Sequence, residues 1–389
     1  MASQRDYLHV ELPLRVAVGP AALDDLAREL DRAGVRRAFV VCGRSFAAPD
    51  GGHRLLATAL GERLVHVHPG ARPHSPAAMV QETARLMADT SADGVIAVGG
   101  GSAIVTARAA TVLLAEGGAL PDLATRIDST GQMISPRLKA PKLPQFVVAT
   151  TPTTATVKAG SAVLDETTQR RMALFDPQTR ARMVCVVPAL LDSAPHDIFL
   201  SAGLNTLCMA IEGLIARKGD PFADAGLIHA ARLAADALPR LGTGHDAAAR
   251  ADLVVAAILC GRATDSTNGG MASALGHAIG ARHGVENGLI NALAMPAVLI
   301  DAAEAARPDL PKVAIALGLP RTASAADIAT HLRALVADLG VKPRLRDLGV
   351  SQDALPELAD LAFADWFLRG NPRPVESAAQ VLGFLRHLW

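Results

Sequence analysis

The first half of the chain alternates between short apolar runs and longer segments with helical spacing, and this alternation constrains the fold more than any other feature. Strand, helix and strand in repeated succession are typical of a parallel sheet that helices cover on both faces. We therefore predict a doubly wound, mostly parallel, Rossmann-like α/β domain. The strand-like runs span residues 14–20, 38–43, 94–101 and 146–152, and the helix-like segments span residues 24–34, 75–90 and 103–115.

The pattern changes after Pro188, where helical periodicity continues to the C-terminus without intervening strands. A chain of 389 residues is long enough for two packed cores. We predict an α/β domain over residues 1–188 and an all-helical substrate domain over residues 189–389. Residues 117–144, rich in Gly, Pro, Ser and charge, are predicted to form a long surface loop. The helices are expected at residues 197–217, 221–238, 247–265, 271–282, 288–306, 325–339 and 375–388.

Composition narrows the class of partner. Lys plus Arg (38) balance Asp plus Glu (38), so we expect neither a nucleic-acid surface nor a polybasic membrane patch. The apolar runs at residues 94–105 and 289–300 are shorter than the roughly 20 residues of a membrane span. The N-terminus lacks a signal-peptide pattern, and four widely spaced cysteines are interpreted as buried thiols in a reducing cytosol. We therefore expect a cytoplasmic protein whose partner is a small-molecule substrate.

Two motifs predict a nucleotide site. Gly99-Gly-Gly-Ser102 stands where a strand ends and a helix begins, so the backbone can approach a phosphate closely; a tight turn without a ligand is the alternative. Thr150-Thr-Pro-Thr-Thr154 ends the next long strand, at the same carboxyl edge where open α/β sheets bind ligands. The predicted cofactor-binding residues in these motifs are Gly99, Gly100, Gly101, Ser102, Thr151, Thr153 and Thr154.

Gly43 and Arg44 follow an earlier strand of the same sheet and are also predicted to contact the cofactor. A carboxylate at this position would accept a hydrogen bond from the ribose 2′-hydroxyl of NAD, whereas an arginine can bind the 2′-phosphate of NADP. We favour NADP over NAD on this basis. A surface arginine in a turn would give the same pattern, so both nucleotides stay open.

The segment Ser201-Ala-Gly-Leu-Asn205-Thr, continued by Met209 and Glu212, resembles the metal-binding helix of the iron-type alcohol dehydrogenases. That helix reads roughly Gly-x-Asp-Ala-Leu-x-His-Ala-x-Glu, with two metal ligands four residues apart on one face. The Gly-Gly-Gly-Ser and Pro-Thr-Thr motifs also match the family. The resemblance covers nearly the whole chain, and it implies a dehydroquinate synthase-like fold and an NAD or NADP cofactor.

The resemblance also indicates that the metal ligands are replaced. Leu275-Gly-His277-Ala-Ile-Gly-Ala281 aligns with the family without gaps and puts Ser273 and Asn287 at the two remaining ligand positions. Together with Asn205 and Met209, these groups are poor ligands for iron or zinc, so we expect no bound metal. A shifted register would make His283 the surviving ligand, but it needs two compensating gaps.

Three residues are predicted to be catalytic. The family places the histidine equivalent to His277 beside the nicotinamide, where it can relay protons; a buried, hydrogen-bonded histidine is the alternative. Asn205 and Asn287 could polarise a carbonyl as hydrogen-bond donors. Glu212 is expected to hold the helix in place. Lys158, Met209, Ser273 and His283 are the predicted substrate contacts, although Lys158 could equally be a solvated loop lysine.

Within the family the chain looks most like the maleylacetate reductases, which share Asn at position 205, an Asn371-Pro-Arg-Pro-Val375 motif and a final tryptophan. This implies a metal-independent NAD(P)H-dependent reductase of a small carbonyl or 2-enoate, with a dicarboxylate as one candidate, bound in the cleft between the two domains, and a homodimer. The alternative is a repurposed scaffold, either a non-redox lyase, cyclase or isomerase or a nucleotide-binding protein without hydride transfer. The candidate carboxylate clamps are Arg108, Lys158, Arg262 and Arg282.

Overall fold

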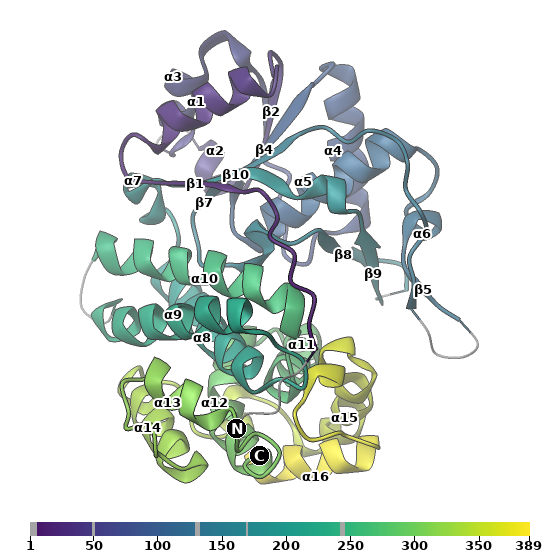
Figure 1. The fold of residues 1–389 in the computed structure, drawn as a ribbon. Coiled ribbons are helices and arrows are strands. Elements are labelled where there is room, and N and C mark those ends of the chain that lie inside the picture. Colours follow the sequence, from purple (N-terminus) through teal and green to yellow (C-terminus); the bar gives the residue numbers. More distant parts are fainter. Residues whose placement is uncertain (1–5, 49–50, 129–132, 169, 242–245) are drawn as a thin grey trace. The chain divides into compact units, whose positions relative to one another are not determined.

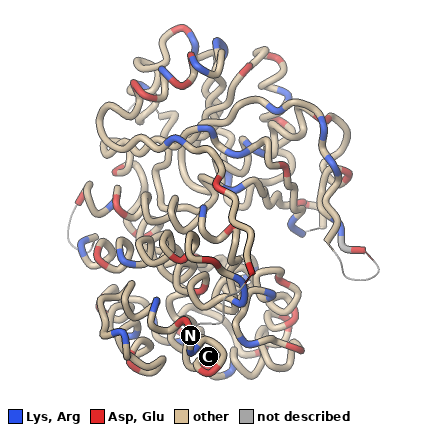
Figure 2. Tube along the Cα trace, viewed as in Figure 1, with Lys and Arg blue, Asp and Glu red and all other residues tan. Residues whose placement is uncertain are grey.

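The computed structural model describes residues 6–48, 51–128, 133–168, 170–241 and 246–389. It comprises two compact units, one formed by residues 12–194 and the other by residues 195–389 together with the N-terminal residues 1–11. The units thus divide six residues beyond the predicted position at 188/189, and the N-terminal residues group with the helical unit instead of the α/β unit. In both units, Lys and Arg are interspersed with Asp and Glu along the chain (Figure 2).

The α/β unit contains the predicted doubly wound sheet (Figure 1). Six strands pair in the order β1-β10-β7-β4-β2-β3, and every pair is parallel. The strands are β1 (Arg15–Val18), β2 (Ala38–Cys42), β3 (Leu64–His68), β4 (Gly94–Gly99), β7 (Gln145–Ala149) and β10 (Ala181–Val186). The helices are α1 (Ala22–Arg32), α2 (Arg44–Ala47), α3 (His53–Leu60), α4 (Ala77–Asp89), α5 (Gly101–Glu116), α6 (Leu120–Leu123) and α7 (Pro188–Leu191).

The position of each strand in the sheet follows from its residues. All five residues of β2 and of β7 are buried, as expected for central strands that helices cover on both faces. Phe39 of β2 and Phe146 of β7 are completely buried in the core. Edge strand β1 instead leaves Val16 and Val18 about half exposed.

The predicted loop at 117–144 is only partly a loop. It contains α6 and the antiparallel pair β5 (Arg126–Ile127) and β6 (Met133–Ile134), while residues 129–132 lie outside the described part. Sequence patterns also missed β3, β10 and the antiparallel hairpin of β8 (Gly160–Asp165) and β9 (Arg170–Phe175). In β3 the histidines His66 and His68 replace apolar residues, which hides the strand pattern.

The second unit is helical, as predicted (Figure 1). Sequence patterns missed α13 and α15, which are short helices with proline in their first turn. The other helices lie within a few residues of the predicted ranges, except that α12 ends five residues early. The helices are α8 (His196–Ile215), α9 (Pro221–Ala237), α10 (Ala247–Thr267), α11 (Met271–His283), α12 (Asn287–Asp301), α13 (Leu310–Ala316), α14 (Ala325–Asp338), α15 (Leu355–Ala364) and α16 (Ala378–Leu388).

Helix α8 is the core helix of this unit. It packs against α9, α10 and α12. Among the described residues it is the one helix long and apolar enough to cross a membrane by length and composition, with a mean hydropathy of 1.7 in its most apolar stretch, but 78% of that stretch is buried inside the protein. Its apolar surface is therefore already covered by neighbouring helices. The four cysteines are buried and form no disulfide, and burial raises the pKa of Cys42 and of Cys185 to about 12, as expected for unreactive thiols.

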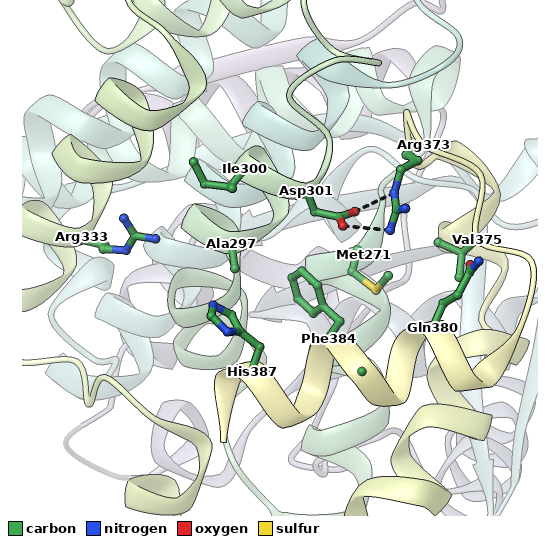
Figure 3. Close-up of a pocket in the computed structure, with 11 residues that line it drawn as sticks. Met271, Ala297, Ile300, Asp301, Arg333, Arg373, Val375, Gln380, Phe384 and His387 are labelled. Carbon is green, nitrogen blue, oxygen red and sulfur yellow. Dashed lines mark hydrogen bonds and ion pairs between the residues drawn. The ribbon is translucent and has the colours of Figure 1, made fainter.

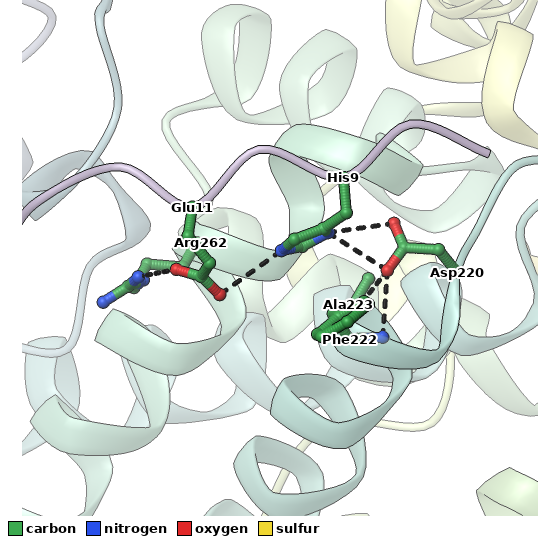
Figure 4. Close-up of polar contacts among 6 residues, drawn as sticks. All are labelled: His9, Glu11, Asp220, Phe222, Ala223 and Arg262. Carbon is green, nitrogen blue, oxygen red and sulfur yellow. Dashed lines mark hydrogen bonds and ion pairs between the residues drawn. The ribbon is translucent and has the colours of Figure 1, made fainter.

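A polar cluster ties the N-terminal segment to the helical unit (Figure 4). The His9 ring lies between two carboxylates, with Nδ1 3.2 Å from an Asp220 oxygen and Nε2 3.3 Å from a Glu11 oxygen. Asp220 also caps the N-terminus of α9, and the His9 ring stacks on Phe222 at 4.8 Å between centroids. Arg262 of α10 pairs with Glu11. The hydrogen bond from the His9 ring to the Asp220 carboxylate raises the pKa of His9 above its usual value.

We predict that His9→Gln destabilises the protein more at pH 5.5 than at pH 8.5. The raised pKa means that protonated His9 stabilises the fold fully below its unfolded pKa, and that this contribution disappears as the pH rises through the folded pKa. The expected loss of Tm is about 1–3 °C at pH 5.5 and near zero at pH 8.5. Thermal unfolding of both proteins at the two pH values measures it. An equal loss at both values would show that packing, not charge, is the contribution of His9.

Candidate functional site

The three motifs predicted to bind nucleotide lie at one edge of the sheet. Strand β4 lies between β2 and β7, and all three run parallel. Gly99 pairs with Ala149, and its carbonyl accepts a hydrogen bond of 3.1 Å from Thr150 N–H. Gly43 directly follows β2. The carboxyl ends of the three strands, and the motifs that follow them, are therefore neighbours, which is the usual ligand-binding edge of such sheets.

The turn from β4 into α5 requires glycine. Gly99 has φ of +140°, a conformation that other residues rarely adopt. A Cβ atom on Gly100 would lie 2.4 Å from Thr151 Oγ1, whereas one on Gly101 would lie an ordinary 3.5 Å from Thr153 Oγ1. The 16-residue helix α5 starts here without an acidic side chain in its first turn. Its first N–H groups are thus available to an anion, and the turn fits a phosphate group.

A buried arginine donates hydrogen bonds to the backbone of the segment that follows the threonine motif. Arg108 on α5 is completely buried, and its guanidinium donates to the carbonyls of Ala155 and Gly160, both at 2.6 Å. The Thr153 hydroxyl accepts from Ala155 N–H at 3.2 Å and caps the short 3₁₀ turn Thr154–Thr156. Arg108 therefore positions this loop, and the expectation that it clamps a substrate carboxylate is wrong.

The other residues predicted to bind a substrate carboxylate are Arg262, Arg282 and Lys158. Arg262 pairs with Glu11, and Arg282 pairs with Glu357 at 2.5 Å on the surface. Lys158 is half-buried in the loop that Arg108 holds. Ion pairs engage both Arg262 and Arg282.

Arg44 is exposed and begins α2, with Gly43 in extended conformation before it. A cavity of about 390 Å³ adjoins this helix, and its size suits one part of a nucleotide. The position of Arg44 is compatible with both interpretations of its role. The cavity is lined by Ser45, Gly51, Gly52, Leu55, Ala189, Leu190 and Ser193.

In the helical unit, the predicted metal-ligand positions on α8 contact each other. Asn205 Nδ2 donates to the Met209 sulfur at 3.5 Å. The side-chain amide of Asn205 also hydrogen-bonds the amide of Asn291 on α12 at 2.8 Å. Asn291 is buried, and in this contact its Nδ2 donates to Asn205 Oδ1. Sequence patterns gave no sign of Asn291, which lies inside an apolar run.

The fourth position, Asn287, is the first residue of α12 and lies against α11. A Cβ atom on Gly280 would lie 2.1 Å from Asn287 Oδ1, so α11 and α12 approach closely through glycine. Helix α11 ends at His283, with Gly284 in the left-handed conformation as its C-cap. His283 is half-buried at that end.

Buried Glu212 holds the N-terminus of α11. Its carboxylate accepts backbone hydrogen bonds from Ala272 (2.7 Å) and Ser273 (3.3 Å) and a 2.5 Å bond from the Ser273 hydroxyl. Asn371 Oδ1 accepts from Met271 N–H at 3.2 Å. Burial raises the pKa of the Glu212 carboxyl, while the hydrogen bonds from Ser273 and the backbone lower it. Glu212 thus holds a helix in place, as expected, and the Ser273 hydroxyl is engaged by Glu212.

His277 lies one turn further along α11 and has a carboxylate partner. Its Nδ1 is 2.8 Å from Asp365 Oδ2, and the edge of Phe367 packs on the ring with centroids 5.0 Å apart. The His277 side chain is 30% exposed, so it is neither fully buried nor free in solvent. Sequence patterns did not reveal Asp365, because 88 residues separate it from His277.

A divalent metal does not fit the groups at the predicted ligand positions. The side chains of Asn205 and Met209 contact each other, and the Ser273 hydroxyl donates to Glu212. Across the part of the chain that the structure describes, no three His, Cys, Asp or Glu side chains are grouped as metal ligands would be. Neutral amide, thioether and hydroxyl groups are weak ligands for iron or zinc.

A second cavity lies in the helical unit, away from the predicted metal-ligand positions (Figure 3). It has a volume of about 340 Å³ and lies beside α12, α14 and α16. Arg373 of the Asn371–Val375 motif forms a bidentate ion pair with Asp301 at its rim, at 2.8 and 3.0 Å. None of the predicted site residues, all of which are described, lines this cavity. The motif therefore ties the C-terminal segment to α11 and α12.

Comparison with known proteins explains the combined geometry. The model for "Iron-containing alcohol dehydrogenase" matches residues 13–188, and that for "Fe-containing alcohol dehydrogenase family, C-terminal" matches residues 199–389. The chain belongs to the iron-containing alcohol dehydrogenase family. Both the predicted family and the predicted fold class are thereby confirmed, and the protein is a member of an oxidoreductase family.

Three relatives of the chain are 20% to 29% identical to it. It is 29% identical to the probable alcohol dehydrogenase EutG of Escherichia coli over 76% of its own length and 72% of that protein. It is 28% identical to the maleylacetate reductase of Sphingobium indicum, covering 97% and 96% of the two chains. The solved structure of sulfoacetaldehyde reductase from Bifidobacterium kashiwanohense in complex with NAD+ has a TM-score of 0.87 at 20% identity, covering 99% of both chains.

Glu212→Gln is predicted to lower the free energy of unfolding by about 1–3 kcal/mol. The new side chain keeps one oxygen and replaces the other by NH₂, so part of the donor set of Ala272 and Ser273 would lose its acceptor. Chemical denaturation followed by circular dichroism measures the change. Glu357→Gln is the matched control, because Glu357 is 58% exposed and should contribute little. Equal effects of the two substitutions would contradict the role given to Glu212.

Gly100→Ala is predicted to destabilise the α/β unit by about 1–3 kcal/mol, because its Cβ would displace Thr151. Gly101→Ala is the neighbouring control. Its Cβ would make an ordinary contact at the first position of α5, where alanine is a good helix former. Thermal unfolding should rank Gly100→Ala well below the other two proteins. A lower Tm for Gly101→Ala than for Gly100→Ala would show that the close contact with a threonine is at Gly101 and not at Gly100.

Proposed function

We propose that this protein is a metal-independent NAD(P)H-dependent reductase of a small carbonyl or 2-enoate compound. The observation that carries the proposal is the contact between Asn205 and Met209, two predicted ligand positions that satisfy each other. The family is named for iron, but this chain offers amide, thioether and hydroxyl groups in its place. Likeness to maleylacetate reductase over nearly the whole chain supports a reductase.

The glycine and threonine motifs of the α/β unit would hold the nucleotide. The N–H groups that begin α5 would bind its phosphates, with Gly100 and Thr151 packed too closely for any side chain between them. The nicotinamide, when bound, supplies hydride. A relative solved with NAD+ supports this class of cofactor. Exposed Arg44 leads us to propose NADPH over NADH.

The polar groups of the helical unit would handle the substrate oxygen. Without a metal to polarise the carbonyl, hydrogen-bond donors must stabilise the negative charge that develops on oxygen during reduction. We propose Asn205 and Asn287 as such donors and His277 as the source of the proton. Met209 and His283 would line the same face, and Lys158 is the proposed clamp for a carboxylate-bearing substrate. Ser273 would act indirectly, through its bond to Glu212.

We also propose a cytoplasmic homodimer. Edge strand β1 exposes Val16 and Val18 together with an unpaired backbone edge, which a second copy could cover.

The first experiment is titration of the purified protein with NADPH and NADH by nicotinamide fluorescence, with metal analysis of the same sample. We expect NADPH to bind, Arg44→Ala to weaken NADPH binding roughly 5- to 10-fold without affecting NADH, and metal to be far below one equivalent. The control is Arg54→Ala, which removes an exposed arginine from α3. Carbonyl dicarboxylates would then be screened for NADPH oxidation.

Three other outcomes would contradict or change the proposed function. Failure to bind either nucleotide would exclude the reductase. One equivalent of tightly bound metal would show that the predicted ligand positions are wrong. Nucleotide binding without oxidation by any carbonyl or enoate compound would favour the non-redox alternative.

A further inference from the structure

We propose that Asp365 is a positioning residue for His277, and that it sets which ring nitrogen exchanges the proton with the substrate. The inference rests on the proposed role of His277 as proton donor. Its own basis is the 2.8 Å contact between His277 Nδ1 and Asp365 Oδ2. A carboxylate accepts only, so Nδ1 carries the hydrogen in this contact, and Nε2 is the nitrogen whose proton can be given away and recovered.

Asp365 is itself held in place. Its second oxygen, Oδ1, accepts from Phe367 N–H at 2.9 Å and caps the 3₁₀ turn Trp366–Gly370. Its side chain is 15% exposed, so water competes little for the carboxylate. The two oxygens thus have separate partners, one in the backbone and one on the His277 ring. This arrangement fixes the carboxylate before any substrate binds, as a positioning group requires.

The ring plane of His277 has a second support. Phe367 packs its edge on the imidazole at 64° between the planes. Phe367 in turn fills the space that a side chain at Gly269 would need, since a Cβ there would lie 2.3 Å from the Phe367 ring. Asp365 therefore determines both the hydrogen bond to the ring and the turn that places the packing partner. Either one alone would leave the imidazole free to rotate.

The chemical consequence concerns both protonation states. Reduction of a carbonyl leaves an alkoxide; the Nε2–H bond of the imidazolium breaks as an O–H bond forms on that oxygen, and His277 becomes neutral with its hydrogen on Nδ1. The Asp365 carboxylate accepts from Nδ1–H both before and after the transfer, so the neutral ring is retained as the Nδ1–H tautomer. Water then restores the proton on Nε2. The same carboxylate thus supports donation and reloading without changing its own protonation.

Asp365→Asn tests the assignment. Asparagine is as good a helix-capping residue as aspartate, so the turn should be retained and Tm should change by no more than about 2–3 °C. The amide can donate as well as accept, so the neutral ring is no longer held in one tautomer. We expect a mixture of Nδ1–H and Nε2–H forms in ¹⁵N NMR of the His277 ring at pH 8, against a single Nδ1–H form in the wild type. We expect kcat for NADPH oxidation to fall about 10- to 100-fold with nucleotide Kd unchanged.

Asp220→Asn is the matched control. Asp220 also caps a helix and also contacts a histidine, His9, in the same unit. It should leave both the His277 resonances and kcat as in the wild type. In a His277→Gln background, Asp365→Asn should have no further effect on kcat, because a positioning residue acts only through its partner.

Two outcomes would overturn the proposal. One is a wild-type His277 ring with hydrogen on Nε2; the other is an Asp365→Asn protein that keeps the Nδ1–H tautomer. An additional loss of kcat in the His277→Gln background would also contradict it. The NMR measurement needs no substrate, so it still decides the role of Asp365 if the protein oxidises no NADPH, in which case the proposed function fails separately.

Discussion

The interaction on which the helical unit depends is the burial of a carboxylate at the start of a helix. Glu212 is buried, and its carboxylate accepts hydrogen bonds from N–H groups in the first turn of α11. The side-chain oxygen of Asn371 accepts from the neighbouring Met271 N–H. Burying an ionisable group is costly unless its hydrogen bonds are complete, and a helix N-terminus provides several donors together with positive potential. The direction of α11, and hence the location of Ser273 and His277, follows from this arrangement.

In the α/β unit, glycines without side chains determine the path of the turn from β4 into α5. Gly99 has a positive φ that favours glycine, and a Cβ atom on Gly100 would clash with the Thr151 hydroxyl. Arg108 supports the adjoining loop through two carbonyls from within the core. The turn into α5 is therefore shaped by glycine backbone, and Arg108 holds the adjoining loop. The α/β unit thus combines glycines with a buried guanidinium, whereas α11 of the helical unit begins on a buried carboxylate.

The sequence predicted this fold well where local patterns carry it. Central strands β2, β4 and β7 are apolar runs, and the motifs at their ends lie together because parallel strands share an edge. Patterns failed at β3, where histidines interrupt the apolar alternation, and at the β8–β9 hairpin. The site was predictable only in its motif residues. Asp365 and Asn291 matter through contacts with residues 86 to 88 positions away, which no local spacing encodes.

The capping of α11 also has a consequence for synthesis of the chain. The helix starts at Met271, but its acceptors lie 60 residues earlier at Glu212 and 100 residues later at Asn371, and the His277 partner lies 88 residues later. A ribosome that adds 5–20 residues per second delivers the last of these roughly 5–20 s after α11 begins to emerge. During that interval Glu212 can already bind the first turn of α11, but Asn371 and the Asp365 partner of His277 have not yet been synthesised. The contact between His277 and Asp365 is thus among the last to form.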